Sequence, residues 1–168
     1  MITDATRQGA YESLLSVDEQ IARTIELLAT LGVDRQTVII LTSDNGSTWG
    51  EHRMFSQRKE CPYEECLRVP LIVRWPGHVP AGATTDAMVH FADWYPTLCA
   101  VAGAAVPADR AMDGVNVLPV LQGGAGEVCT RRFWQWNRYA PLVECNAAMR
   151  DGDWKLVRPS IDSLMRVT

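Results

Sequence analysis

Apolar side chains recur at three- and four-residue steps near the start of the chain. They are Leu14, Val17, Ile21, Ile25 and Leu28, and charged residues separate them. This spacing gathers them on one stripe of an amphipathic helix. The pattern therefore predicts a helix over residues 6–31, with Gly32 placed to end it.

A different pattern follows, made of short continuous apolar runs. Residues 37–43 read Thr-Val-Ile-Ile-Leu-Thr-Ser, and a second predicted strand, Leu71-Ile-Val-Arg-Trp75, is closed by Pro76-Gly77. A β-branched run between polar residues fits a strand that is buried on both faces. A helix, a short loop and a buried strand are typical of an α/β domain.

The second half of the chain predicts one more helix and an antiparallel end. The helix covers residues 94–102, with Asp93 as its N-cap and Gly103 after it. Strands are predicted over residues 132–139 and 147–157. Asp151-Gly152-Asp153 interrupts the second run and is a strong hairpin-turn signal.

Composition narrows the classes of protein that are possible. The chain has 168 residues, 47% apolar and 21% charged, which suits one soluble domain. A net charge of −4 argues against nucleic acid as a partner. Apolar runs are too short to span a membrane. The polar start carries no signal-peptide core, and periplasmic, extracellular and cytoplasmic locations all stay open.

The five cysteines do not form a recognisable framework. Their count is odd, their spacing is irregular and no CxxC pair is present, which argues against a structural zinc site. Only Cys61 and Cys66 flank a stretch with candidate chemistry. They could pair, but the sequence does not require it.

That stretch, residues 44–66, has no clean period and is predicted to be a long functional loop. It begins with Asp44-Asn45-Gly46, directly after the first predicted strand. Ligands bind at the carboxyl ends of strands in open α/β sheets, and carboxylate and amide oxygens suit Ca²⁺ or Mg²⁺. The alternative is an ordinary Asn-Gly turn.

The order of motifs around Asp44-Asn45-Gly46 favours a functional site over an ordinary turn. After it come Gly50-Glu51-His52, Lys59, Tyr63-Glu64, Arg68-Val69-Pro70, Pro76-Gly77, Asp93-Trp94-Tyr95-Pro96-Thr97-Leu98, Asp113-Gly114 and Arg150-Asp151-Gly152-Asp153-Trp154-Lys155-Leu156-Val157. This series resembles the sulfatase family, within the alkaline-phosphatase-like superfamily, over nearly the whole chain. The resemblance implies an α/β sandwich with a mostly parallel central sheet over residues 1–126. Residues 127–168 would form the start of a small antiparallel C-terminal subdomain.

The resemblance also implies roles for individual residues. Asp44 and Asn45 match the pair that binds a divalent cation, usually Ca²⁺, with Mg²⁺ as the second possibility. Lys59 stands four residues before Tyr63, the family's spacing for a lysine that contacts sulfate. Such groups stabilise the charge that develops on sulfate oxygens during cleavage. The alternative for Lys59 is a solvated loop lysine, and the adjacent Arg58 could be mistaken for it.

Other candidates are less specific. His52 is either a group at the edge of the site or a loop histidine that contacts Glu51 or the backbone. Trp134 and Trp136 alternate on one predicted strand, so they face the same side. They either stack on a sugar or pack in the core.

The family's nucleophile motif is absent from these 168 residues. Formylglycine forms from a Cys or Ser in Cys/Ser-x-Pro-x-Arg, and no Cys or Ser here has that context. The paired aspartates that complete the metal site in the family are also absent. We therefore expect a C-terminal portion of a sulfatase that needs an N-terminal segment or partner chain. Alone, it should be inactive and bind metal weakly, because calcium takes six or more oxygens.

Three functions stay open at this point. The first is hydrolysis of a sulfate ester, either a small molecule or a sulfated glycan. The second is hydrolysis of a phosphonate or phosphate monoester, although such relatives tend to have Asp-His where this chain has Asp44-Asn45. The third is a non-catalytic chain that binds an anionic glycan or a partner through an exposed sheet and the Lys59 loop.

Overall fold

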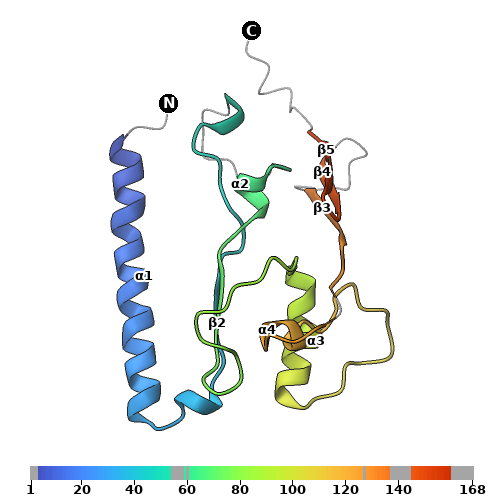
Figure 1. The fold of residues 1–168 in the computed structure, drawn as a ribbon. Helices are drawn as coiled ribbons and strands as arrows, with labels where there is room; N and C mark the ends of the chain where they lie inside the picture. Colours follow the sequence, from blue (N-terminus) through green and yellow to red (C-terminus); the bar gives the residue numbers. More distant parts are fainter. Residues whose placement is uncertain (1–3, 54–58, 60, 127, 137–144, 160–168) are drawn as a thin grey trace. The chain divides into compact units, whose positions relative to one another are not determined.

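The computed structural model describes residues 4–53, 59, 61–126, 128–136 and 145–159 (Figure 1). The chain divides into two units. The first comprises Met1–Trp75, Trp134–Ala148 and Val157–Thr168, and the second comprises Pro76–Phe133 and Met149–Leu156. The expected boundary near residue 126 stays a prediction.

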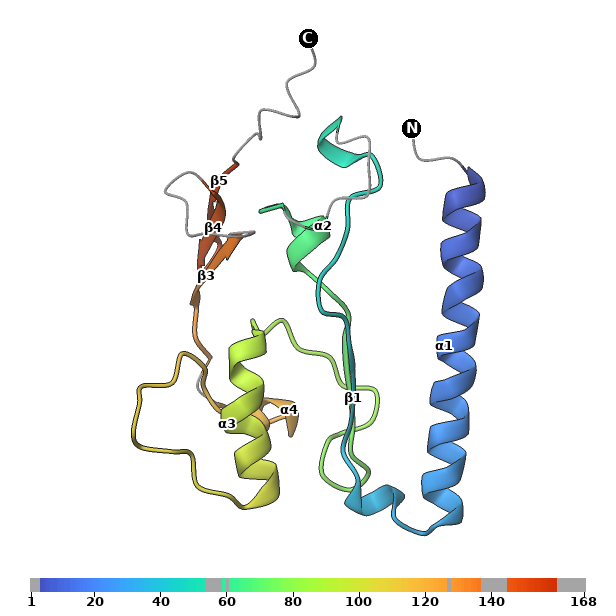
Figure 2. The same ribbon diagram turned by 180° about the vertical axis from the view of Figure 1, so that it is seen from behind.

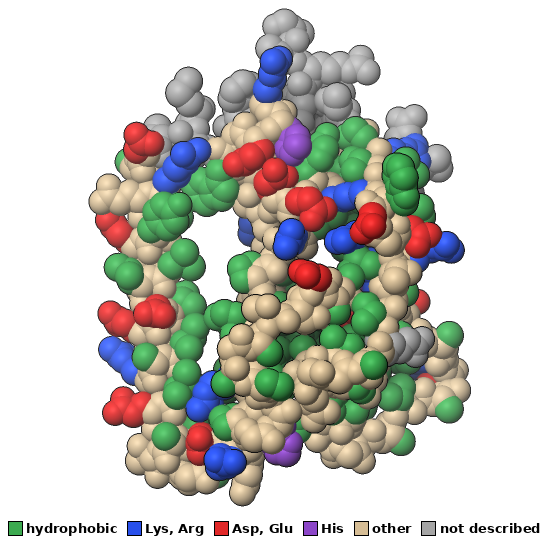
Figure 3. All heavy atoms as spheres, viewed as in Figure 1, with side chains coloured by type: hydrophobic (Ala, Val, Ile, Leu, Met, Phe, Trp, Pro, Cys, Tyr) green, Lys and Arg blue, Asp and Glu red, His purple; other side chains and the backbone are tan. Residues whose placement is uncertain are grey.

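The first unit begins with the predicted helix. Helix α1 spans Asp4–Thr30, and Gly32 follows in the left-handed region, with φ 68°, donating its N–H to Ala29 O. In Figure 3 the acidic and basic side chains along α1 lie mainly on one side of the helix, beside its apolar side chains. The apolar stripe is only partly covered: Ile21 and Ile25 are half-buried, whereas Leu14 is 58% exposed.

Two short strands follow, joined by the long loop. Strand β1 spans Ile39–Thr42 and strand β2 spans Leu71–Arg74, as predicted. They pair antiparallel, and Thr42 lies opposite Leu71 (Figures 1 and 2). The loop therefore leaves the carboxyl end of β1 and returns at the same end of the pair. The short 3₁₀ helices η1, Asp34–Gln36, and η2, Glu51–Arg53, and the helical turn α2, Glu64–Leu67, complete this region.

Burial of the first strand on both faces was wrong for this chain. Within the described residues, Ile39, Ile40 and Leu41 are only half-buried and Thr42 is exposed. Their apolar side chains have too few neighbours here to be covered completely. β1 and β2 pair antiparallel, whereas the expected central sheet is mostly parallel.

Helix α3, Phe91–Ala102, begins three residues earlier than predicted, and its N-cap is His90 rather than Asp93. The Nδ1 atom of His90 accepts the Ala92 N–H at 3.2 Å, and Asp93 Oδ2 accepts the His90 N–H at 2.7 Å. Burial, with Arg132 nearby, lowers the pKa of His90, which favours the neutral ring that this cap needs. Gly103 ends the helix with φ 65°, as predicted.

The Asp93 carboxylate is completely buried and joins three segments of the second unit. Its Oδ1 atom accepts the Val115 N–H at 2.9 Å and a hydrogen bond from the Arg132 guanidinium. Arg132 also donates to the Asp113 carbonyl at 2.8 Å. A buried ion pair of this kind holds its surroundings because neither charge can reach water. Helix α4, Leu118–Leu121, follows this segment.

A three-stranded sheet completes the described chain, in the order β3-β4-β5. The strands are β3, Arg131–Trp136, β4, Asn146–Asp151, and β5, Trp154–Arg158. Gly152 has φ 56° in the β4–β5 turn, which confirms the predicted hairpin. Residues 137–139 of the predicted strand lie outside the described residues. Among the helices described, none is long and apolar enough to cross a membrane.

Replacing Asp93 should strongly destabilise the chain. Asp93→Ala would leave the buried Arg132 guanidinium without its carboxylate, at a cost of about 3–5 kcal/mol. Urea denaturation followed by circular dichroism measures the change. Asp109→Ala is the matched control, because Asp109 forms an exposed pair with Arg110, and it should change stability by less than about 1 kcal/mol. Equal stability of the two variants would contradict the role of Asp93.

Candidate functional site

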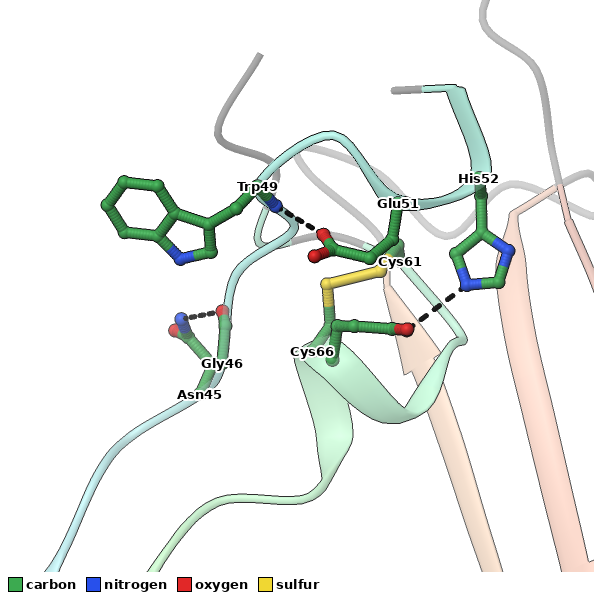
Figure 4. The surroundings of a disulfide bond; sticks show 8 residues. Asn45, Gly46, Trp49, Glu51, His52, Cys61 and Cys66 are labelled. Atoms are coloured by element: carbon green, nitrogen blue, oxygen red, sulfur yellow. Dashed lines mark hydrogen bonds and ion pairs between the residues drawn. A yellow bond between two sulfur atoms is a disulfide. The ribbon is translucent and has the colours of Figure 1, made fainter. Parts of the chain in front are cut away.

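The candidate site begins where β1 ends. The Asp44 carboxylate is exposed, and its Oδ1 atom accepts the Asn45 N–H at 2.9 Å. Asn45 is half-buried, and its Nδ2 atom donates to the Gly46 carbonyl at 2.8 Å (Figure 4). That bond engages the amide nitrogen, so Oδ1 is the atom of Asn45 that suits a cation.

Gly46 brings this loop against the backbone of α2. Its N–H donates to the Cys66 carbonyl at 3.0 Å. A Cβ at position 46 would lie 1.8 Å from the Glu65 carbonyl oxygen. Only glycine permits so close an approach, because no other residue lacks Cβ. Asp44-Asn45-Gly46 is therefore more than a free Asn-Gly turn: its last residue is held against another segment.

A disulfide closes that other segment. Cys61 and Cys66 are bonded, their Cα atoms are 5.8 Å apart, and the two residues are 3% and 2% exposed (Figure 4). The sequence left this pairing open. The bond spans the start of α2, and Cys66 is the residue whose carbonyl receives the Gly46 N–H.

His52 also contacts this segment. Its Nε2 atom lies 3.1 Å from Glu65 Oε2, and its ring stacks on Tyr63 with the ring centroids 3.8 Å apart. Glu51, the partner expected from the sequence, instead accepts the Trp49 N–H at 2.5 Å. That hydrogen bond is the main cause of a lowered pKa of Glu51. Sequence reasoning missed Glu65, because no motif signals a contact thirteen residues away.

Lys59 is exposed and makes no hydrogen bond or ion pair with the residues that the structure describes. Its ammonium group is thus not engaged in holding the described loop. No contact joins Lys59 to Asp44 among the described residues, and its sulfate contact stays a prediction. Trp134 and Trp136 are half-buried and alternate with Phe133 and Gln135, which are exposed. Stacking on a sugar and packing in the core both stay predictions for these tryptophans.

The donor set limits what the chain can hold by itself. Asp44 and Asn45 supply one carboxylate and one amide, whereas Ca²⁺ takes six to eight oxygens. Within the described ranges, no group of three or more His, Cys, Asp or Glu side chains is placed to hold a metal ion. That Asp44 and Asn45 form one edge of a cation site stays a prediction.

Comparison with known proteins identifies the family. The sulfatase family profile matches residues 4–104, more than half of the chain. A Bacteroides thetaiotaomicron protein named N-acetylglucosamine-6-O-sulfatase is 41% identical over 86% of this chain. The Homo sapiens N-acetylgalactosamine-6-sulfatase is 35% identical over 71% of it. The chain belongs to the sulfatase family.

Solved structures confirm the fold class. One is a protein bound to its substrate D-glucosamine-2-N,6-O-disulfate. It is 34% identical, with a TM-score of 0.74 over 86% of this chain and 29% of its own. The other is the phosphonate monoester hydrolase of Agrobacterium radiobacter. It is 31% identical, with a TM-score of 0.78 over 91% of this chain and 32% of its own. The expected α/β, alkaline-phosphatase-like fold is thus confirmed. The chain spans about a quarter of the two curated relatives, 26% and 24% of their lengths.

Adding one methyl group at Gly46 should disrupt the loop. In Gly46→Ala the new Cβ would overlap the Glu65 carbonyl, at a cost of about 1–3 kcal/mol. Urea denaturation measures the loss. The control is Gly9→Ala in α1, where a Cβ meets nothing within 4 Å. Alanine there should be neutral or stabilise by up to about 1 kcal/mol. A Gly46→Ala chain as stable as wild type would show that the close approach is absent in solution.

Proposed function

We propose that this chain forms one edge of the active site of a sulfuric ester hydrolase, which releases sulfate and an alcohol. The observation that carries the proposal is the Asp44-Asn45 pair, held at the end of β1 by the contact of Gly46 with α2. Asp44 and Asn45 are proposed to hold a divalent cation, with Ca²⁺ favoured over Mg²⁺. Lys59 is proposed to contact the sulfate group.

The chemistry of these residues suits a sulfate ester. The ester spreads negative charge over its oxygens, and cleavage adds charge to the bridging oxygen. A cation, when bound, would draw off part of that charge. The ammonium of Lys59 would place a second positive charge against sulfate oxygens. Because described residues do not engage Lys59, binding a sulfate would not break an existing ion pair among them.

The nucleophile is proposed to come from outside these 168 residues. The family's formylglycine arises within Cys/Ser-x-Pro-x-Arg, and the printed sequence lacks that motif. We accordingly propose that the remaining metal ligands and the nucleophile are supplied by an N-terminal segment or a partner chain. His52 stays a low-ranked candidate, because Glu65 and Tyr63 already engage its ring.

The names of the relatives point to the substrate class. Both curated relatives are named for amino sugars that carry a 6-sulfate, and one solved neighbour holds a glucosamine disulfate. We propose a sulfated amino sugar, free or within a glycan, as the substrate.

A phosphonate monoester is the second candidate. The Agrobacterium radiobacter hydrolase of that class has a TM-score of 0.78 with this chain. The residue after Asp44 favours sulfate, because phosphatase relatives tend to have a histidine where this chain has Asn45. Parallel assays on N-acetylglucosamine-6-sulfate and an aryl phosphonate monoester separate the two.

The activity prediction concerns the protein expressed together with any in-frame sequence upstream of Met1. Asp44→Ala should lower turnover of N-acetylglucosamine-6-sulfate by about 100-fold or more, because a ligand of the charge-stabilising group is removed. The variant should stay folded at the assay temperature, as circular dichroism would verify, since Asp44 is exposed. Asp109→Ala, another exposed acid, is the control and should keep wild-type turnover.

Two results would contradict this account. Wild-type turnover by the Asp44→Ala variant would show that Asp44 is not a metal ligand. Metal-dependent hydrolysis by the purified 168-residue chain would show that the nucleophile need not come from elsewhere.

A further inference from the structure

Three contacts from the proposed metal-edge loop reach one short segment. We call residues 44–52 the edge loop and residues 61–67 the closed turn. The Gly46 N–H donates to Cys66 O, the His52 ring stacks on Tyr63, and His52 Nε2 lies 3.1 Å from Glu65 Oε2. The closed turn therefore contacts the edge loop near both ends of that loop.

One covalent bond constrains the closed turn, beside the backbone hydrogen bonds that Cys66 and Leu67 donate to Tyr63 O. Its helix α2 has four residues. An isolated helical turn is unstable, because ordering its backbone loses more free energy than its few hydrogen bonds contribute. The Cys61–Cys66 bond removes much of the freedom that these residues would otherwise have. Both cysteines are at least 97% buried, since they are 3% and 2% exposed.

The contact at Gly46 tolerates little displacement. The Gly46 Cα packs against the Glu65 carbonyl so closely that a Cβ would overlap it. The carbonyl that accepts the Gly46 N–H belongs to Cys66, a member of the disulfide. A change in the backbone around Cys66 thus acts on the residue directly after Asn45.

We infer that Cys61 and Cys66 are positioning residues: their disulfide holds the closed turn as a template that orders the edge loop, and with it Asp44 and Asn45. The consequence for catalysis rests on the proposed function, but the ordering of the loop does not. Reducing the bond should loosen the edge loop while the rest of the fold stays intact.

Hydrogen exchange measured by mass spectrometry tests this on the 168-residue chain. A water-soluble phosphine breaks the S–S bond: each sulfur gains one hydrogen, and the phosphine becomes its oxide with an oxygen from water. The mass gain of two hydrogens verifies reduction. Exchange in peptides covering residues 44–52 should accelerate by about tenfold or more, given the usual effect of closing a short loop.

Two controls keep the test specific. Peptides from α3, Phe91–Ala102, should exchange at an unchanged rate, since α3 contains neither cysteine of the bond. Cys61→Ser/Cys66→Ser should reproduce the effect of reduction without a reductant. Cys99→Ser/Cys129→Ser, at two free half-buried cysteines, should leave exchange in the edge loop unchanged.

The outcomes decide the inference. Unchanged exchange in the edge loop after verified reduction overturns it. Acceleration in α3 to the same degree also overturns it, since the bond would then stabilise the whole fold without ordering this loop in particular. Ca²⁺ affinity of the longer protein, measured by calorimetry, is a separate readout. Absent affinity in the oxidised protein would contradict the proposed function and leave the exchange result standing.

Discussion

The close approach of Gly46 to the backbone of α2 is the constraint on which the candidate site depends. Asp44 and Asn45 lie on a loop that leaves a short, half-buried strand, and such loops are usually free to move. Here the residue that follows them is in contact with Glu65 and Cys66. A glycine at 46 and a closed turn at 61–67 together hold the loop next to the two proposed metal ligands, Asp44 and Asn45.

Two aspartates illustrate how burial separates structure from candidate chemistry. Asp93 is completely buried, and backbone N–H groups and Arg132 satisfy its oxygens, so its charge is used inside the fold. Asp44 is exposed, and among the described residues its hydrogen bonds come from its neighbours Ser43 and Asn45. A carboxylate that still faces solvent can exchange water for a cation. The two side chains are chemically identical. Burial makes Asp93 a structural residue, whereas exposure leaves the Asp44 carboxylate accessible to a ligand.

Local patterns were sufficient to predict most elements. Period and turn chemistry located α1, the two strands of the first sheet and the β4–β5 hairpin, because these depend on near neighbours. The N-cap of α3 was wrong because Asp93 is drawn toward Val115 and Arg132, which are distant in sequence. The Glu65 contact and the disulfide also join separated residues. The position of Lys59 relative to Asp44 also depends on residues that are separated in sequence, and it stays a prediction.

The most direct measurement is a crystal structure, with Ca²⁺ added, of the protein expressed together with its upstream reading frame. The account predicts one bound ion with oxygens of Asp44 and Asn45 about 2.3–2.6 Å away. The remaining ligands should come from residues outside this chain's 168. Calcium bound elsewhere, with the Asp44 carboxylate left in solvent, would contradict the assignment of this edge.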